Sequence, residues 1–243
     1  EKMIMSIYKL YKDIERKTMS PAKKAMAKND YFAFYVGRPL SYLLTVPFLK
    51  TNITPNQVSY LSIAPLILGF LTMTFTTNFI LLLLAWFLFF LWNLLDGVDG
   101  NLARYREQYS KDGSVVDAMA GYVAMVLTYF GAGIVATHLN GSDMYVILGA
   151  LSGISLIFPR LVMHKYINTV ARNESVNNIK DKSNFSTIKL LALNMTSITG
   201  IPQVLLLVTI LTNQWEFFTL VYFTINFLLM IFSLYSLFKK ENV

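Results

Sequence analysis

The chain has 243 residues, of which 55% are hydrophobic and only 14% are charged, and its mean hydropathy is +0.49. Soluble globular domains usually carry about 25% charged residues, so this composition excludes a soluble domain as well as an intrinsically disordered chain. The absence of cysteine excludes a disulfide scaffold, thiolate nucleophiles and thiolate metal sites. The composition therefore predicts a protein that crosses a membrane several times.

Residues 1–50 form a basic, amphipathic region ahead of the first apolar stretch. The apolar residues that recur there at helical spacing, with lysine and arginine between them, are Met3, Ile7, Leu10, Tyr11 and Ile14. This spacing predicts an N-terminal amphipathic helix that lies in the membrane interface and is attracted to anionic lipid. A solvated basic helix is the alternative interpretation. The region has no apolar segment followed by a small-residue cleavage site, so we do not expect a signal peptide.

Six apolar stretches follow, each close to the length of about 20 residues that crosses a hydrocarbon core of roughly 30 Å. They are rich in leucine, isoleucine and phenylalanine, without the period-two alternation of strands. The stretches are Val58–Phe75, Phe79–Leu95, Val115–Leu139, Tyr145–His164, Leu190–Leu211 and Phe217–Phe238. We therefore expect an all-α, polytopic membrane domain of six transmembrane helices over residues 51–243, preceded by a cytoplasmic or interfacial region over residues 1–50.

The basic residues predict how these helices are oriented. Of the 21 lysine and arginine residues, ten precede the first stretch, three lie between the second and third, six flank the connection between the fourth and fifth, and two follow the sixth. By the positive-inside rule, both termini and the loops after the second and fourth stretches are cytoplasmic in a cell membrane. This topology accounts for the net charge of +7, and nothing else in the sequence indicates binding to nucleic acid.

Three aspartates cluster where the second apolar stretch ends and the third begins. Asp96 and Asp99 are three residues apart and share one face of a helix, and Asp117 lies at the start of the third stretch. Carboxylates that converge at the edge of a membrane repel one another unless a cation lies among them, and ionisable residues at this depth are functional candidates. Their oxygens are ligands that suit Mg²⁺, Mn²⁺ or Ca²⁺.

Small residues and one cation accompany this cluster. Gly100, Ala103 and Gly113 let a ligand approach the backbone closely, and Arg104 is a bidentate donor for phosphate. Together with a divalent cation, these groups suit a diphosphate. The alternative interpretation is that the aspartates cap a helix end, that Arg104 pairs with one of them, and that the glycines serve helix packing.

The spacing of these residues resembles the signature of the CDP-alcohol phosphotransferase family, also called CDP-alcohol phosphatidyltransferases. The matching positions are Asp96-x2-Asp99-Gly100-x2-Ala103-Arg104-x8-Gly113-x3-Asp117, and the segment Thr54–Ser59 before the first stretch is also similar. The resemblance implies a membrane enzyme in which an acceptor hydroxyl attacks the β-phosphorus of a CDP-alcohol donor and CMP leaves. The product is a phospholipid or a phosphodiester of a small polyol, depending on which side is the lipid.

The resemblance also implies roles for individual residues. Asp96, Asp99 and Asp117 would hold two divalent cations, Mg²⁺ or Mn²⁺, against the diphosphate. The cytidine nucleotide would lie beside a second set, Asn56, Gly100, Ala103, Arg104 and Gly113. Membrane lipids are expected partners, and a homodimer is an expectation from the family alone.

The sequence departs from the family pattern at one position. Four residues after Asp117 the family has a fourth aspartate, the expected general base, and this chain has Gly121. Glycine has no side chain that accepts a proton, so we expect slower chemistry with nucleotide binding retained. His164, at the cytoplasmic end of the fourth stretch, is a weak candidate for a replacement base, and the acceptor can also supply its own base.

Other interpretations stay open at this stage. A catalytically weakened homologue would bind nucleotide and metal as a partner or regulatory subunit, or the carboxylate was removed by substitution to trap a state. A transporter coupled to cations is disfavoured, because the acids lie at the edge of the bilayer. Arg160, inside the fourth stretch, either binds a phosphate or polar head of the acceptor or extends to the interface.

Overall fold

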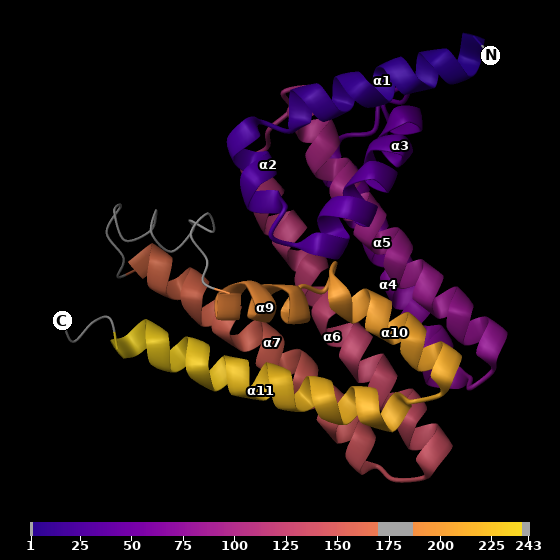
Figure 1. The fold of residues 1–243 in the computed structure, drawn as a ribbon, viewed down its shortest axis with the longest axis vertical. Helices are drawn as coiled ribbons and strands as arrows, with labels where there is room; N and C mark the ends of the chain where they lie inside the picture. Colours follow the sequence, from indigo (N-terminus) through magenta and orange to yellow (C-terminus); the bar gives the residue numbers. More distant parts are fainter. Residues whose placement is uncertain (1, 170–186, 240–243) are drawn as a thin grey trace.

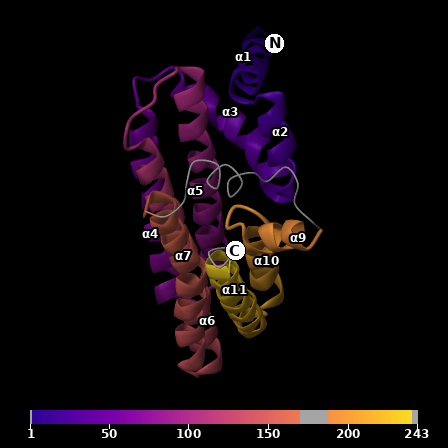
Figure 2. The same cartoon turned by 90° about the vertical axis from the view of Figure 1, so that its left-hand side faces the viewer.

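The computed structural model describes residues 2–169 and 187–239, except for the side chains of residues 2–6 and 188, and every element in these residues is helical. Short helices come first: α1 (Lys2–Thr18), α2 (Pro21–Ala27), the π-helical turn η1 (Ala33–Gly37) and α3 (Arg38–Phe48). Figure 1 shows these elements gathered at one end of the molecule, and Figure 2 shows them beside the long helices rather than among them.

Five helices in the described part of the chain are long and apolar enough to cross a membrane. They are α4 (Pro55–Phe75), α5 (Phe79–Tyr105), α6 (Gly113–Asn140), α7 (Met144–Thr169) and α11 (Trp215–Lys239). They contain the first four and the sixth of the predicted apolar stretches. The prediction of an all-helical, multi-pass membrane protein is therefore confirmed.

The structure differs from the prediction at the fifth stretch. Instead of one helix over residues 190–211, two helices, α9 (Thr187–Thr196) and α10 (Ile201–Thr212), meet at a break and are bent by 53°. The break follows from the local sequence, because Gly200 precedes α10 and Pro202 in its first turn has no amide hydrogen to continue a helix from α9. By length and composition, the described helices provide five candidate membrane spans, or six if the bent pair is one span.

Local capping decides where the helices nearest the aspartates begin. The Thr54 hydroxyl accepts a hydrogen bond from the Gln57 amide, and the Gln57 side chain accepts one from the Thr54 amide, which together form a capping box at the start of α4. At the opposite end of the bundle, α6 ends at Gly141, whose φ of 79° lies in the left-handed region that glycine adopts without strain. These two features set the start of α4 and the turn from α6 into α7.

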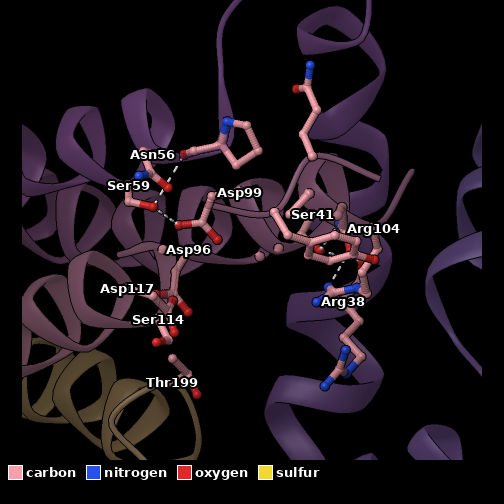
Figure 3. A pocket seen from close by; sticks show the side chains of 18 of the residues that line it. Arg38, Ser41, Asn56, Ser59, Asp96, Asp99, Arg104, Ser114, Asp117 and Thr199 are labelled. Carbon is pink, nitrogen blue, oxygen red and sulfur yellow. Dashed lines mark hydrogen bonds between the residues drawn. The ribbon is translucent and has the colours of Figure 1, made fainter. Parts of the chain in front are cut away.

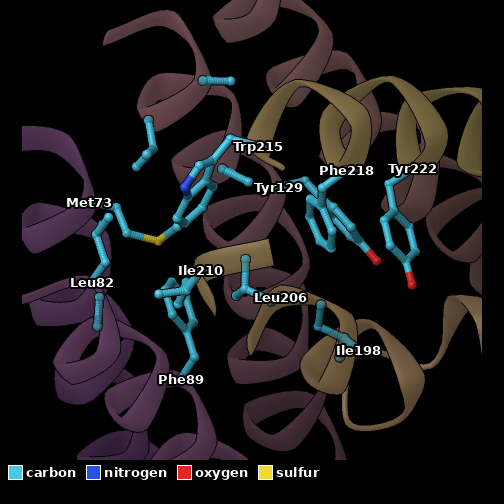
Figure 4. Close-up of a cluster of buried hydrophobic side chains, with 14 of the residues drawn as sticks. Met73, Leu82, Phe89, Tyr129, Ile198, Leu206, Ile210, Trp215, Phe218 and Tyr222 are labelled. Atoms are coloured by element: carbon cyan, nitrogen blue, oxygen red, sulfur yellow. The ribbon is translucent and has the colours of Figure 1, made fainter. Parts of the chain in front are cut away.

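The long helices pack through small residues and through an aromatic core. Gly133 of α6 and Gly149 of α7 approach so closely that a Cβ on Gly149 would lie 2.5 Å from the carbonyl oxygen of Tyr129. Trp215 and Phe218 of α11 lie in a buried cluster with side chains of α4, α5, α6 and α10 (Figure 4). Many leucine, isoleucine and phenylalanine side chains on the outer faces are exposed, as lipid-facing positions require.

The apolar face of α1 contacts protein. Ile14 is fully buried against Tyr42 of α3, and the Tyr105 hydroxyl at the end of α5 donates a hydrogen bond of 2.7 Å to Asp13. Other residues of the predicted amphipathic face pack around the same cluster, namely Ile7, Leu10 and Tyr11. The helix thus covers α3 and the end of α5, and its position in the membrane interface stays a prediction. The side chain of Met3 lies outside the described residues.

Candidate active site

Three aspartates converge at one wall of a pocket. Asp96 and Asp99 lie one turn apart near the end of α5, and Asp117 lies in the second turn of α6. One carboxylate oxygen from each lies within 4.8 Å of the other two (Figure 3). Asp99 is buried, Asp96 is half-buried and Asp117 is exposed, so the cluster opens to the outside at Asp117. The predicted convergence of the three residues is therefore present in the fold.

Helix α4 supplies polar groups to this wall. The Ser59 hydroxyl donates a hydrogen bond to the Asp99 carboxylate. One turn earlier, the Asn56 amide donates to Asp112 at 3.2 Å and accepts from the Ser110 hydroxyl at 3.0 Å. Because Asn56 and Ser59 are three residues apart, they project from the same face of α4. Asn56 lines the pocket and also holds the loop that leads into α6.

Basic residues line the pocket as well. Arg38 of α3 and Arg104 of α5 face the aspartates across the opening (Figure 3), and Lys23 of α2 completes the basic set. Burial lowers the pKa of Lys23 to about 8, and the charges of Arg104 and Arg38 add to this effect. The Nε atom of Arg104 is buried and has no hydrogen-bond partner among the described residues. The cavity of about 510 Å³ thus has an acidic wall and a basic wall, and its size suits a small-molecule ligand.

Glycine permits two close approaches in this region. A Cβ on Gly97 would lie 2.6 Å from the Cβ of Ser41, so the absence of a side chain lets α3 lie directly against α5. A Cβ on Gly100 would lie 2.9 Å from an Nη atom of Arg104, so glycine leaves room for the guanidinium. The small residues singled out from the sequence all line the pocket, namely Gly100, Ala103 and Gly113.

The aspartate cluster fits a divalent cation. Its three carboxylates are hard oxygen donors of the kind that Mg²⁺ and Mn²⁺ bind. Among residues 2–169 and 187–239, none of the three forms an ion pair with lysine or arginine, so no side chain neutralises them directly. The three carboxylates are therefore placed so that they could hold a divalent cation.

Gly121 and His164 are not among the residues that line the aspartate pocket. Gly121 is one turn beyond Asp117 on α6, and a Cβ on this residue would meet no atom within 4 Å. His164 of α7 does not line the pocket, and its Nδ1 atom lies 2.9 Å from the Tyr122 hydroxyl. The position of the expected base is thus open space, and the histidine considered as a substitute contacts a tyrosine.

Arg160 is also separate from the aspartate pocket. It lies inside α7 and is not among the residues that line the cavity. One of its Nη atoms is 3.8 Å from the sulfur of Met125 on α6, and its Nε atom is buried without a hydrogen-bond partner in the part of the chain that the structure describes. The guanidinium therefore has donors that the described protein leaves unused.

Comparison with family models supplies the remaining observation. A model described as CDP-alcohol phosphatidyltransferase matches residues 52–231, which include the aspartates and most of the pocket. The chain belongs to the CDP-alcohol phosphatidyltransferase family. Members of the CDP-alcohol phosphatidyltransferase family are membrane phosphotransferases that typically use a divalent metal. A comparison with curated proteins found no match to this chain.

Sequence reasoning missed several residues of this CDP-alcohol phosphatidyltransferase pocket. The missed lining residues include Lys23, Arg38, Ser59, Ser114 and Thr199. Ser59 had a usable signal, because it lies one helical turn after Asn56. Lys23 and Thr199 had none, because they come from α2 and from the turn between α9 and α10, far in the sequence from the aspartates.

Proposed function

We propose that this protein transfers a substituted phosphoryl group from a CDP-alcohol donor to an acceptor alcohol and releases CMP. The observation that carries this proposal is a pocket with three converging carboxylates on one wall and two arginines on the other (Figure 3). A diphosphate between these walls would meet divalent cations on one side and guanidinium donors on the other. Membership of the family supports the same reaction class.

The metal ligands in this proposal are Asp96, Asp99 and Asp117, which would hold two Mg²⁺ or Mn²⁺ ions. When bound, the cations supply charge stabilisation to the transferring phosphoryl group and to the departing phosphate. The hydrogen bond from Ser59 orients the buried Asp99 carboxylate toward its neighbours. The exposure of Asp117 supports entry of ligands from that side.

The nucleotide-binding set comprises Asn56, Gly100, Ala103, Arg104 and Gly113. The two glycines and the alanine present little side chain to a ligand, so the cytidine nucleotide could lie against the backbone. The unpaired Nε of Arg104 is available to a phosphate oxygen of the donor.

Arg160 is the proposed contact for a phosphate or polar head of the acceptor. Its unpaired Nε supports this role, since a buried guanidinium nitrogen without a hydrogen-bond partner is costly in a membrane helix. Because Arg160 contacts Met125 of α6, two turns after Asp117, the acceptor would extend along α6 from the aspartates. The product would be a phospholipid or a polyol phosphodiester.

The proposed location is the cell membrane, with both termini and the pocket on the cytoplasmic side. Nine of the 21 lysine and arginine residues lie between positions 2 and 38, and α1 and α3 of this segment pack at the end of α5 that bears the aspartates (Figure 1). The positive-inside rule then puts the pocket and this region on the same side. A homodimer is proposed from the family alone.

Gly121 favours a second candidate function. Without a carboxylate at this position, the protein would bind nucleotide and metal but turn over poorly, and would act as a partner or regulatory subunit. The two candidates share one binding site and differ in turnover, so a single series of measurements separates them.

The test is thermal unfolding of the detergent-purified protein with CMP or CDP, in the presence and absence of Mg²⁺ or Mn²⁺. A ligand at 100 times its Kd stabilises the folded state by about 2.7 kcal/mol, so binding raises the unfolding midpoint. We expect a metal-dependent rise that is lost in Asp117→Asn and kept in Asp143→Asn, a change in the exposed turn at the opposite end of the bundle. No rise at millimolar nucleotide would contradict both candidates.

Turnover is then measured as CMP release from CDP-diacylglycerol and from CDP-choline, with glycerol, diacylglycerol or water as the acceptor. Metal-dependent release supports the transferase. Metal-dependent binding without release from either donor supports the partner subunit.

A further inference from the structure

The pocket contains a hydroxyl group, that of Thr199, to which the proposed function assigns no role. Thr199 lies in the turn between α9 and α10 and lines the cavity on the side of Ser114 and Asp117 (Figure 3). Any hydroxyl that forms a new bond to phosphorus must lose its proton. The open space at Gly121 offers no group for this proton, so the other polar groups at this side of the pocket are candidates.

Thr199 is the first member of a hydrogen-bonded chain that leads away from the pocket. Its hydroxyl oxygen lies 3.2 Å from that of Ser197, and the Ser197 hydroxyl donates to the carboxylate of Asp30. Since the single proton of Ser197 is directed to Asp30, the hydrogen bond between the two hydroxyls is donated by Thr199. We call Thr199, Ser197 and Asp30 the hydroxyl relay. Its direction leaves the lone pairs of the Thr199 oxygen to accept from a hydroxyl in the pocket.

The relay is held by contacts between segments that are distant in the sequence. Asn194 of α9 accepts a hydrogen bond from the Tyr31 amide at 3.0 Å and donates to the Asn29 carbonyl at 2.7 Å, which holds the backbone on both sides of Asp30. The Asn93 amide of α5 donates to the Thr199 carbonyl at 3.1 Å. The Asp30 end of the relay is therefore held by α9, and the Thr199 end is held by α5, which carries Asp96 and Asp99.

The end of the relay is a carboxylate with unused acceptor capacity. The second oxygen of Asp30 is buried and has no hydrogen-bond partner among the described residues. A Cβ on Gly200 would lie 2.9 Å from this oxygen, so glycine at the break leaves room for the carboxylate. One oxygen of the Asp30 carboxylate therefore accepts from Ser197, and the described protein leaves the other unpaired.

We propose that the hydroxyl relay removes the proton of the acceptor hydroxyl during transfer, a role that rests on the proposed function. As the acceptor oxygen forms its bond to the β-phosphorus, its proton passes to Thr199, the Thr199 proton passes to Ser197, and the Ser197 proton passes to Asp30. The bond between the β-phosphorus and the bridging oxygen breaks, and CMP leaves with that electron pair. Asp30 ends as the neutral acid and returns its proton to solvent before the next turnover. Thr199 contacts the reacting hydroxyl, and Ser197 and Asp30 act through it.

The test measures CMP release from CDP-diacylglycerol in mixed micelles with Mg²⁺, using glycerol and, separately, water alone as the acceptor. Thr199→Val removes the hydroxyl at nearly constant volume, and we expect kcat to fall about 10²-fold or more with little change in the KM for the donor. Asp30→Asn keeps an oxygen that accepts from Ser197, and we expect it to lower kcat by a similar factor. Thr199→Ser should retain most of the wild-type kcat. The matched control is Thr196→Val, because among the described residues the Thr196 hydroxyl bonds to the Ala192 carbonyl of its own helix and to no member of the relay.

A second variant separates proton transfer from a structural role. Gly121→Asp adds a carboxylate where the structure has open space, one turn from Asp117. In the Thr199→Val background it should restore kcat, which a purely structural defect would not allow. An unchanged kcat in Thr199→Val overturns the relay and leaves the transferase proposal intact. A fall in the kcat of Thr199→Val that Gly121→Asp does not restore has the same two consequences. A wild-type protein that binds CDP but releases no CMP overturns the transferase proposal and the relay with it.

Discussion

Replacing Asp99 with asparagine should change the stability of the free protein and its affinity for metal in opposite directions. The carboxylate oxygens of the three aspartates lie within 4.8 Å of one another, and two full charges at that separation repel by about 3 kcal/mol at an effective dielectric constant of 20. Asp99→Asn removes two of the three repulsive pairs. It keeps an oxygen that can accept the hydrogen bond of Ser59. Asp99 is only 5% exposed, so water screens its charge less than that of the exposed Asp117.

Solvent and relaxation reduce this repulsion, and we expect the metal-free variant to gain about 1–2 kcal/mol in the free energy of unfolding. For a chain of this length that gain raises the unfolding midpoint by about 2–4 °C per kcal/mol. The same change removes one of three metal ligands, so the Mg²⁺ concentration that half-saturates the CDP-induced stabilisation should rise more than tenfold, or about 1.4 kcal/mol.

The assay is thermal unfolding in detergent over a Mg²⁺ titration, first without nucleotide and then with CDP. Asp143→Asn is the control, since it removes an aspartate from the exposed turn between α6 and α7. Wild-type metal affinity in Asp99→Asn would show that this carboxylate is not a ligand. A metal-free variant less stable than wild type would refute the repulsion that the geometry implies.

Two further predictions concern the basic wall and the helix packing. Because the pKa of Lys23 is about 8, this residue is charged at pH 7 and neutral at pH 9.5. CDP affinity measured by isothermal titration should therefore weaken by about threefold to tenfold between these pH values. In Lys23→Met the CDP affinity should depend less on pH. Gly149→Ala puts a Cβ 2.5 Å from a backbone oxygen of α6, so the unfolding midpoint should fall by the equivalent of about 1–3 kcal/mol. In Gly131→Ala the new Cβ meets side chains rather than backbone, with the sulfur of Met73 at 3.0 Å and the Phe70 ring at 3.5 Å. A loss as large as that of Gly149→Ala would contradict the packing explanation.

The sequence alone was sufficient to predict the features of the structure that depend on a local pattern of residues. The lengths of the apolar stretches predicted the five long helices α4, α5, α6, α7 and α11. This was possible because the length needed to cross a bilayer can be judged for each segment separately. The spacing of Asp96 and Asp99 placed both on one helical face, and the separation to Asp117 matched a known family whose model also matches the chain. The capping box at Thr54 is a local feature of the same kind, since it involves residues three apart.

Tertiary structure alone decided the features that depend on contacts between distant segments. The apolar face of α1 matched a membrane-surface helix, and only the fold shows that Ile14 is covered by α3. The position of Thr199 at the pocket involves contacts between distant segments: Asn93 of α5 donates to the Thr199 carbonyl, and Asn194 of α9 bonds to a segment 163 residues earlier in the chain. Such pairings leave no periodicity in the sequence, because each requires two chain segments to be brought together by packing. The three aspartates and Arg104 were therefore predictable as a cluster, whereas the other two basic residues at the pocket, Lys23 and Arg38, and the hydroxyl relay were not.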